Sequence, residues 1–198
     1  MDMRRSSYTE AVLEISPITP EQFIGGALDD DIRGRILKIV EEEGPVMQSV
    51  LAKRLINSYG MQQLGRRLRE KFEILLASMD FPTTVQSEGT VYWSHAAKEK
   101  AGQYAYGYSL YRYCDDEYKR YSYQIPVCEV VNALTDALEQ YDVKFVPKST
   151  LFAKTAQLLG YQRKGASVRS VLEEALAEGC SVGRFVRSGN GRITLPST

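Results

Sequence analysis

The chain has 198 residues, 43% of them hydrophobic, with 25 basic and 25 acidic side chains. That length is enough for one large or two small domains, each with its own core, and a net charge of zero argues against indiscriminate binding to nucleic acid. No apolar run approaches the ~20 residues of a membrane helix, and the segment after Arg4 and Arg5 lacks the apolar stretch of a secretory signal. We therefore expect a cytoplasmic protein without a membrane anchor.

The residue types that usually carry catalysis or metal binding are sparse. Cys114, Cys128 and Cys180 are far apart and odd in number, which is typical of reduced thiols. The single histidine, His95, has neither a cysteine at metal-ligand spacing nor a nucleophile nearby in sequence. The acidic run 115–117 has no second acidic motif to complete a metallonuclease site. We therefore predict that the chain is not an enzyme and holds no metal and no cofactor.

The first half of the chain predicts a lead-in followed by three helices and a hairpin. The lead-in covers residues 1–29 and is expected to be irregular, apart from a helix start at Thr19 and Pro20. Ser49 is the expected N-cap of the second helix, and Gly60 is its expected C-terminal stop. The expected ranges of the three helices and the hairpin are roughly 30–43, 49–59, 62–79 and 81–93.

The second half repeats this order. Ser149 is again an expected N-cap, and Gly160 again ends the helix. Gly189 and Gly191 are expected to supply the positive φ angles of a tight turn in the last hairpin. The expected ranges are roughly 127–138, 149–159, 165–179 and 181–195.

One pattern occurs twice, at an offset of 100 residues. "GMQQLGRRLREKFEILLA" (60–77) and "GYQRKGASVRSVLEEALA" (160–177) agree at seven positions without a gap, where chance would give roughly one. Gly60 and Gly160 are predicted to adopt the left-handed conformation that ends a helix. The second glycine of each copy, Gly65 or Gly165, is predicted to allow close approach at the start of the next helix. The two halves are thus predicted to be copies of one fold.

Three helices around one core, covered by a hairpin, form a winged helix-turn-helix arrangement. The expected fold class is mainly α with small β-hairpins (α+β), organised as tandem winged helix-turn-helix domains over 30–95 and 126–198, with a tyrosine-rich linker at 96–125. The repeated pattern then covers the turn and third helix, the element that enters the DNA major groove in helix-turn-helix proteins.

The linker allows two interpretations. Residues 104–123 hold eight tyrosines, which together with Arg112, Lys119 and Arg120 are able to stack single-stranded bases. Alternatively, the rings pack the two halves together and are largely buried, with Tyr106 and Tyr108 on the opposite face from their neighbours. Packing is the stronger interpretation, because the acidic run 115–117 would repel phosphates.

Charge is segregated in the same way in both copies. Acidic residues are absent from 44–69 and from 143–172, although both segments contain several cations. This segregation predicts a nucleic-acid face, although i to i+4 pairing of Arg69 with Glu73, and of Arg169 with Glu173, is an equally good structural explanation for those two arginines. The predicted contacts, including three arginines of the second wing, are Lys53, Arg54, Arg66, Arg67, Arg69, Lys148, Arg163, Lys164, Arg169, Arg184, Arg187 and Arg192.

The stretch "IVEEEGPVMQSVLAKRLINSYGMQQLGRRLREKF" resembles the uncharacterised C-terminal domain of large bacterial superfamily-1 helicase-like proteins, which often also carry a restriction-endonuclease-like domain. The second half, from "IPVCEVVNALTDALEQ" to "LLGYQRKGASVRSVLEEAL", is similar to the region that closes those proteins, so the resemblance covers about residues 30–195. The matching pattern positions are Glu43, Gly44, Pro45, Arg54, Gly60 and Gly65. The resemblance implies a role in nucleic-acid transactions, but this sequence contains no Walker A motif (GxxxxGK[ST]) and is not itself expected to be the ATPase.

The expected function is therefore a non-catalytic DNA-binding accessory module of a helicase- or nuclease-type system, which contacts duplex or junction DNA. The alternative is a docking or dimerisation module of the same system, with a helicase or nuclease as its protein partner. The choice between DNA and RNA and the oligomeric state stay open.

Overall fold

The computed structural model describes residues 5–96, 108–114, 119–142, 145–162 and 165–196. The chain divides into two units: an N-terminal unit of residues 9–107, and a C-terminal unit that combines residues 1–8 with residues 108–198. Helices and small sheets occur in both units. The α+β class predicted from sequence is confirmed.

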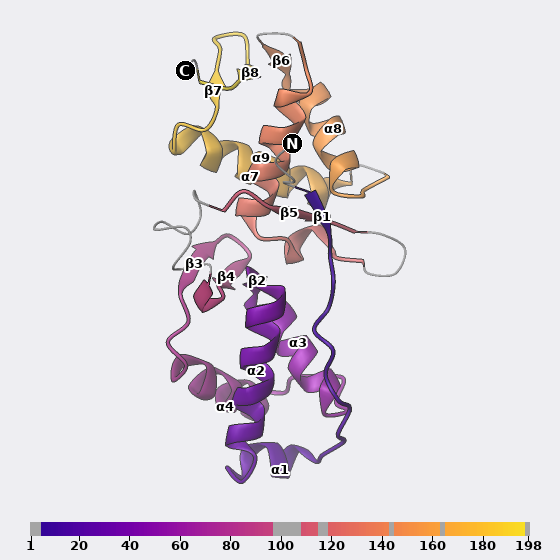
Figure 1. Cartoon of the computed structure of the whole chain (residues 1–198), viewed down its shortest axis with the longest axis vertical. Coiled ribbons are helices and arrows are strands. Elements are labelled where there is room, and N and C mark those ends of the chain that lie inside the picture. The colour runs from indigo at the N-terminus through magenta and orange to yellow at the C-terminus, as the bar shows by residue number, and fades with distance from the viewer. Residues whose placement is uncertain (1–4, 97–107, 115–118, 143–144, 163–164, 197–198) are drawn as a thin grey trace. The chain divides into compact units, whose positions relative to one another are not determined.

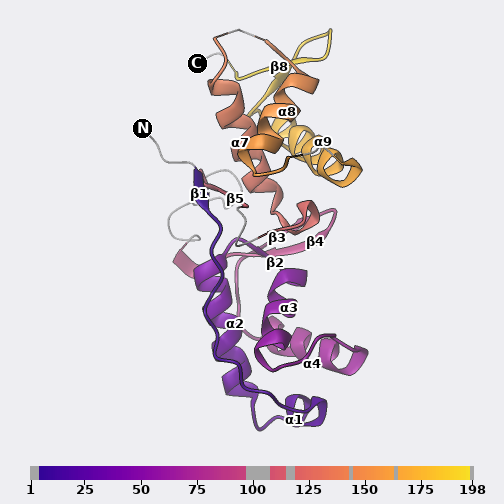
Figure 2. The same ribbon diagram turned by 90° about the vertical axis from the view of Figure 1, so that its right-hand side faces the viewer.

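In the N-terminal unit, helices enclose the core and a small antiparallel sheet lies at one end of them (Figures 1 and 2). The sheet has the strand order β2-β4-β3, so the last strand is central. Helices α2 and α3 lie side by side in the ribbon (Figure 1). The elements are α1 (Pro20–Ile24), α2 (Asp29–Glu43), β2 (Val46–Met47), α3 (Gln48–Ser58), α4 (Arg66–Ala77), β3 (Thr83–Gln86) and β4 (Gly89–Tyr92).

The lead-in is more ordered than expected. Thr19 and Gln22 form a reciprocal capping box at the start of α1, with Thr19 N donating to Gln22 Oε1 at 2.8 Å. Phe23 of α1 is fully buried and meets the Tyr59 ring edge-on at 5.7 Å. The helix start predicted at Thr19 and Pro20 is confirmed, whereas the rest of the lead-in also contains a strand, β1 (Arg5–Ser7).

The C-terminal unit repeats the topology of the N-terminal unit. Its antiparallel sheet has the order β6-β8-β7, again with the last strand in the centre, while β1 pairs in parallel with β5. Both units therefore contain the order helix, strand, helix, helix, hairpin, preceded by α1 in the first and by β1, β5 and η1 in the second. The elements not yet given are β5 (Tyr111–Tyr113), the 3-10 helix η1 (Ser122–Gln124), α7 (Val127–Glu139), β6 (Val146–Pro147), α8 (Lys148–Leu158), α9 (Ala166–Ser181), β7 (Val186–Arg187) and β8 (Arg192–Thr194).

The first strand of each sheet was missed, and this explains two errors in the predicted helix starts. Ser49 and Ser149 are not N-caps, because α3 and α8 already begin at the preceding residue. Met47 and Pro147 are the N-caps instead, and neither makes a side-chain capping bond. Both are extended because they pair in a sheet, so the chain turns directly from strand into helix.

The two glycine pairs have different roles. Gly60 and Gly160 have φ angles of 70° and 90°, so the predicted left-handed helix ends are confirmed. Gly65 and Gly165 are extended N-caps of α4 and α9, which start at residues 66 and 166. A Cβ on either of these two would have no heavy atom within 4 Å, so the predicted close approach there is wrong.

From residue 108 onward, the predicted tyrosine-rich linker lies within the C-terminal unit. Tyr111 on β5 is fully buried, and its hydroxyl donates to Asp136 of α7. Cys114 N donates to the Leu159 carbonyl at the end of α8 at 3.1 Å. Residues 97–107 and 115–118 lie outside the described part of the chain.

Glu129 of α7 is a buried charge that joins three segments of the C-terminal unit. Its carboxylate is fully buried and accepts hydrogen bonds from the Arg112 backbone, the Arg112 guanidinium and the Arg120 guanidinium, the last at 2.9 and 3.0 Å. The Tyr8 ring lies 5.3 Å from the Arg112 guanidinium and 4.3 Å from that of Arg120. Burial alone would raise the pKa of Glu129, but the two guanidinium groups outweigh it and lower that pKa to about 2.

Replacing this carboxylate tests its contribution. Glu129→Gln is expected to reduce the unfolding free energy of the C-terminal unit by about 3 kcal/mol, because two guanidinium groups stay buried without their anion. Since the folded pKa is lowered, the stabilisation is complete above the unfolded value of 4.5 and disappears as the pH falls towards 2. Thermal unfolding followed by circular dichroism should therefore show that the wild type loses this stabilisation between pH 4.5 and 2, whereas the variant does not.

The single tryptophan, Trp93, is buried in the N-terminal unit and supplies the control. Its fluorescence transition should be the same in wild type and Glu129→Gln. Equal stability of the two proteins by circular dichroism between pH 5 and 7 would contradict a stabilising role for Glu129.

The glycines provide a second test of the repeat. Gly60→Ala is expected to cost about 1–2 kcal/mol, because the residue must keep a left-handed conformation. Gly160→Ala should cost more, since its Cβ would also lie 2.2 Å from the Cys114 carbonyl oxygen. Gly65→Ala should change stability by less than about 0.5 kcal/mol. Urea denaturation of the three variants gives the ranking, and a Gly160→Ala protein as stable as Gly65→Ala would contradict it.

Candidate nucleic-acid interface

The turn between the second and third helices of each unit positions the candidate surface. After α3, Gly60 reverses the chain, and Met61 N donates to the Ile56 carbonyl at 3.0 Å. After α8, Tyr161 N donates to the Ala156 carbonyl at 2.8 Å in the same way. The two units therefore share this hydrogen bond after the left-handed glycine that ends the second helix.

The start of α4 presents two exposed arginines. Leu68 and Phe72 are buried, which turns Arg66 and Arg67 outward to solvent. Arg66 lies 3.7 Å from Glu70, but its side chain is 86% exposed, so this ion pair is weak and leaves the guanidinium accessible. Lys53 on the neighbouring α3 is exposed as well.

Arg54, predicted as a contact, has a structural role. Its side chain is 18% exposed and binds the carboxylates of Glu10 and Glu43, the latter at 3.3 Å. Glu43 is fully buried and also accepts the backbone N–H of Ala11 at 2.9 Å. Arg54 therefore joins α3 to the lead-in and to the end of α2, and two acidic partners already neutralise its charge.

Arg54→Ala is expected to reduce the unfolding free energy of the N-terminal unit by about 2 kcal/mol, because buried Glu43 loses a charged partner. Arg67→Ala should change it by less than about 0.5 kcal/mol, since that side chain is exposed. Trp93 fluorescence during urea denaturation reports both values. Equal midpoints for the two variants would argue against the structural role of Arg54.

On the equivalent surface of the C-terminal unit, the carboxylate of Glu173 neutralises two of the cations. The Lys148 ammonium lies 2.7 Å from Glu173, and Arg169 lies 3.9 Å from the same carboxylate, as the i to i+4 spacing predicts. In the N-terminal unit the corresponding pairing of Arg69 with Glu73 is not formed within the described residues. The repeat thus leaves its third helix more cationic in the first copy than in the second.

The last hairpin places two of the three predicted wing arginines in solvent. Arg187 on β7 and Arg192 on β8 are exposed, while Arg184 is half-buried and already interacts with a neighbour. Arg163 and Lys164, predicted in the second turn, lie outside the described residues.

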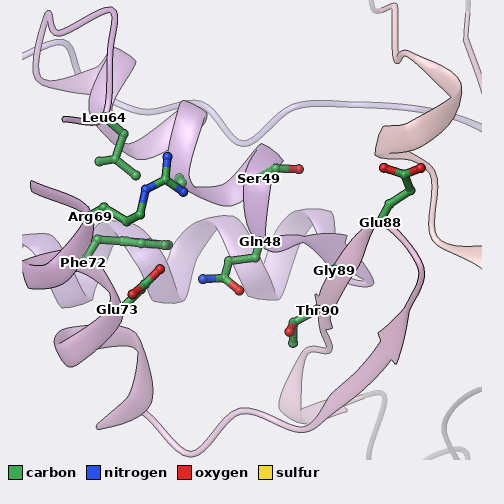
Figure 3. Close-up of a pocket in the computed structure, with 10 residues that line it drawn as sticks. Gln48, Ser49, Leu64, Arg69, Phe72, Glu73, Glu88, Gly89 and Thr90 are labelled. Atoms are coloured by element: carbon green, nitrogen blue, oxygen red, sulfur yellow. The ribbon is translucent and has the colours of Figure 1, made fainter. Parts of the chain in front are cut away.

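A pocket opens between α3, α4 and the β3–β4 hairpin, and encloses about 260 Å³. Gln48 and Glu73 point towards one another on one side of it, as Figure 3 shows, and the Arg69 guanidinium lies apart from them. The hairpin contributes Glu88 and Thr90 on the other side. Burial and the nearby Glu73 carboxylate both raise the pKa of Tyr92 on β4. The pocket is thus polar, with more acidic than basic side chains.

The tyrosines divide between the two interpretations. Tyr111 is buried, whereas Tyr121 and Tyr123 are 64% and 43% exposed and stack on each other with ring centroids 5.4 Å apart. Tyr108 is half-buried, and burial followed by the Glu129 carboxylate raises its pKa. The predicted facing of Tyr106 lies outside the described residues, as do Tyr104 and Tyr118.

Two cations of the tyrosine-rich segment are unsuited to base stacking. Arg112 and Arg120 are 8% and 6% exposed and are bound to Glu129. Sequence reasoning missed Glu129, and also Tyr8, whose ring contacts both arginines. One signal was present: Glu129 is a lone acid among the apolar residues that begin α7, where a buried charge requires cations nearby.

Two other classes of site have no support in the described residues. Among them, no group of three or more histidine, cysteine or acidic side chains is placed to hold a metal ion. No helix in that part of the chain has the length and apolar character to cross a membrane.

Comparison with known proteins finds one family. Residues 21–70 match a family described as a protein of unknown function (DUF3320). The matched segment includes α2, β2, α3, the turn and the first residues of α4. No curated protein and no solved structure matches the chain. The similarity to an uncharacterised domain is therefore shown for the segment that contains the N-terminal candidate surface.

Proposed function

We propose that the two units are tandem winged helix-turn-helix domains that form a non-catalytic DNA-binding module. The repeated order of helix, strand, helix, helix and hairpin supports this assignment, as does the central position of the last strand in both sheets. In such a domain the third helix faces the major groove. Here α4 and α9 occupy that place, and the β3–β4 and β7–β8 hairpins are the wings.

The observation that carries the proposal is the pair of exposed arginines at the start of α4. Residues at the N-terminal end of a recognition helix are the ones that reach DNA. Arg66 and Arg67 stand there, pointing away from the core that Leu68 enters. Guanidinium groups suit this position because they bind phosphates and guanine edges with paired hydrogen bonds.

The second domain contributes through its wing. Arg187 and Arg192 lie on adjacent antiparallel strands and are both exposed. They are suited to follow the phosphate backbone beside the groove. Lys148 and Arg169 contribute less, since Glu173 neutralises them in the unbound protein.

The cellular context we propose is a helicase- or nuclease-type DNA-processing system. This part rests on the resemblance of the chain to the C-terminal domain of helicase-like proteins. Duplex or junction DNA is the substrate expected for an accessory module of this kind.

Salt dependence of DNA binding tests the proposal. Each lost phosphate contact flattens the slope of log affinity against log salt by about 0.9 on duplex DNA. Arg66→Ala with Arg67→Ala, and separately Arg187→Ala with Arg192→Ala, should each reduce the slope by roughly one to two. Affinity should fall equally for unrelated sequences if these contacts are to phosphate. Fluorescence anisotropy with duplex, forked and single-stranded DNA at several salt concentrations measures both effects.

Lys38→Ala is the control, because it removes an exposed cation from α2, which is not part of the proposed DNA surface. Among the contacts described, Lys38 pairs only with Glu42, at 3.5 Å. This variant should leave the slope nearly unchanged. Both double variants binding duplex and forked DNA with the wild-type slope would refute the DNA-binding proposal.

Protein docking is the second candidate function. It is favoured by Ile74 on α4 and Val85 on β3, which are 68% and 82% exposed in the N-terminal unit. Exposed apolar side chains mark interaction surfaces where they form a contiguous patch. This candidate would replace DNA binding if the arginine variants had no effect.

A further inference from the structure

The pocket of the N-terminal unit lies where the C-terminal unit is filled by its own side chains. Helices α3 and α8 begin at residues 48 and 148, and α4 and α9 begin at 66 and 166, so residues 100 apart occupy equivalent places. Three of the pocket-lining residues, Gln48, Ala52 and Glu73, correspond in this way to Lys148, Phe152 and Glu173. The side chains at these positions of the C-terminal unit indicate which chemical group the pocket of the N-terminal unit is suited to bind.

In the C-terminal unit, a lysine occupies it. The Lys148 ammonium lies 2.7 Å from the Glu173 carboxylate and 5.7 Å from the centre of the Phe152 ring. Arg169 shares the same carboxylate at 3.9 Å. One glutamate on the third helix therefore accommodates a lysine and an arginine together.

In the N-terminal unit, both filling side chains are shorter. Gln48 carries no charge, and Ala52 has no ring, so the site stays open as a pocket of about 260 Å³. Glu73 is exposed and forms no ion pair within the described residues. Figure 3 shows its carboxylate directed towards Gln48, with Leu64 and Phe72 providing an apolar wall.

We propose that this pocket binds a lysine side chain presented by a partner protein. The aliphatic stem lies along Leu64 and Phe72, and the ammonium binds Glu73 at the place that Lys148 takes in the other unit. Glu88 of the hairpin lines the opposite side of the pocket, and its carboxylate points away from Glu73 (Figure 3). Arg69 lines the same pocket and does not prevent lysine binding. In the C-terminal unit, Lys148 and Arg169 likewise lie beside a single carboxylate, that of Glu173.

The charges of the pocket favour a cation over a phosphate. Glu73 is the carboxylate that lies beside Gln48, and it would repel an anion bound at the same place. A side chain with an apolar stem also fits a wall of this kind better than a free metal ion does. This inference is independent of the proposed DNA contacts, because Arg66 and Arg67 do not line the pocket.

The probe for this site is Nα-acetyl-lysine N-methylamide, titrated into the full chain and followed by ¹H–¹⁵N NMR. We expect saturable shifts of the amide signals of Leu64, Gly89 and Thr90, which surround the pocket. The norleucine analogue has the same stem without the charge, and should bind at least about fivefold more weakly.

Two variants test the site without altering the core. Glu73→Gln should weaken binding of the lysine probe by about fivefold, because the ion pair is lost. Gln48→Lys should abolish the response, since its own ammonium then occupies the place, as Lys148 does. Glu173→Gln is the matched control in the other unit and should leave the response unchanged. The same spectra report whether each variant is folded.

Three results would overturn the proposal: equal binding of the norleucine analogue, unchanged affinity of Glu73→Gln, or no shift at the three amides. Inorganic phosphate is titrated in parallel, and stronger shifts with phosphate at the same amides would make this an anion site instead. Failure of the duplex titration would refute DNA binding and leave the lysine titration unaffected, so the two proposals fail separately.

Discussion

Burial of Glu129 is the constraint on which the C-terminal unit depends. A buried carboxylate is tolerated only with close cations, and here Arg112 and Arg120 provide them while Tyr8 covers both guanidinium groups. Satisfying one charge therefore brings together α7, β5 and the segment that contains β1. It also buries two arginines of the tyrosine-rich segment. Arg112 and Arg120 therefore serve to neutralise Glu129 and are not exposed for binding a ligand.

The two units illustrate how one fold diverges. Both keep the left-handed glycine and the extended N-cap that orient the third helix. The C-terminal unit uses Glu173 to neutralise the cations beside it, whereas the N-terminal unit exposes Arg66 and Arg67 and leaves a pocket at Glu73. A few side chains at positions 100 residues apart, in units with the same order of helices and strands, thus distinguish a surface whose charges are paired internally from one with groups available to a partner.

Much of the backbone was predictable because local signals decide it. Apolar spacing located the helices, Thr19 and Pro20 marked the start of α1, and the repeated glycines marked the turns. The short strands β2 and β6 were not predictable, since two residues carry no periodicity and become strands only by pairing with β4 and β8. Missing them displaced the expected caps to Ser49 and Ser149. The assignment of the first residues to the C-terminal unit was also beyond local signals, because it depends on a parallel strand pair far apart in sequence.

In the candidate surface, too, some features follow from the sequence and others depend on the tertiary structure. By itself the sequence determined that cations collect in two acid-free segments, that the pattern repeats, and that Arg66 and Arg67 lie on a helix. Only the tertiary structure decided which cations are available, because an ion pair depends on distance in space. Glu10 and Glu43 reach Arg54 from other elements, and Glu129 holds Arg112 and Arg120 although each lies outside its helix. Spacing in the sequence can predict ion pairs only within one helix. The partners of the buried charges described here come from other elements, so they depend on how the helices and strands pack.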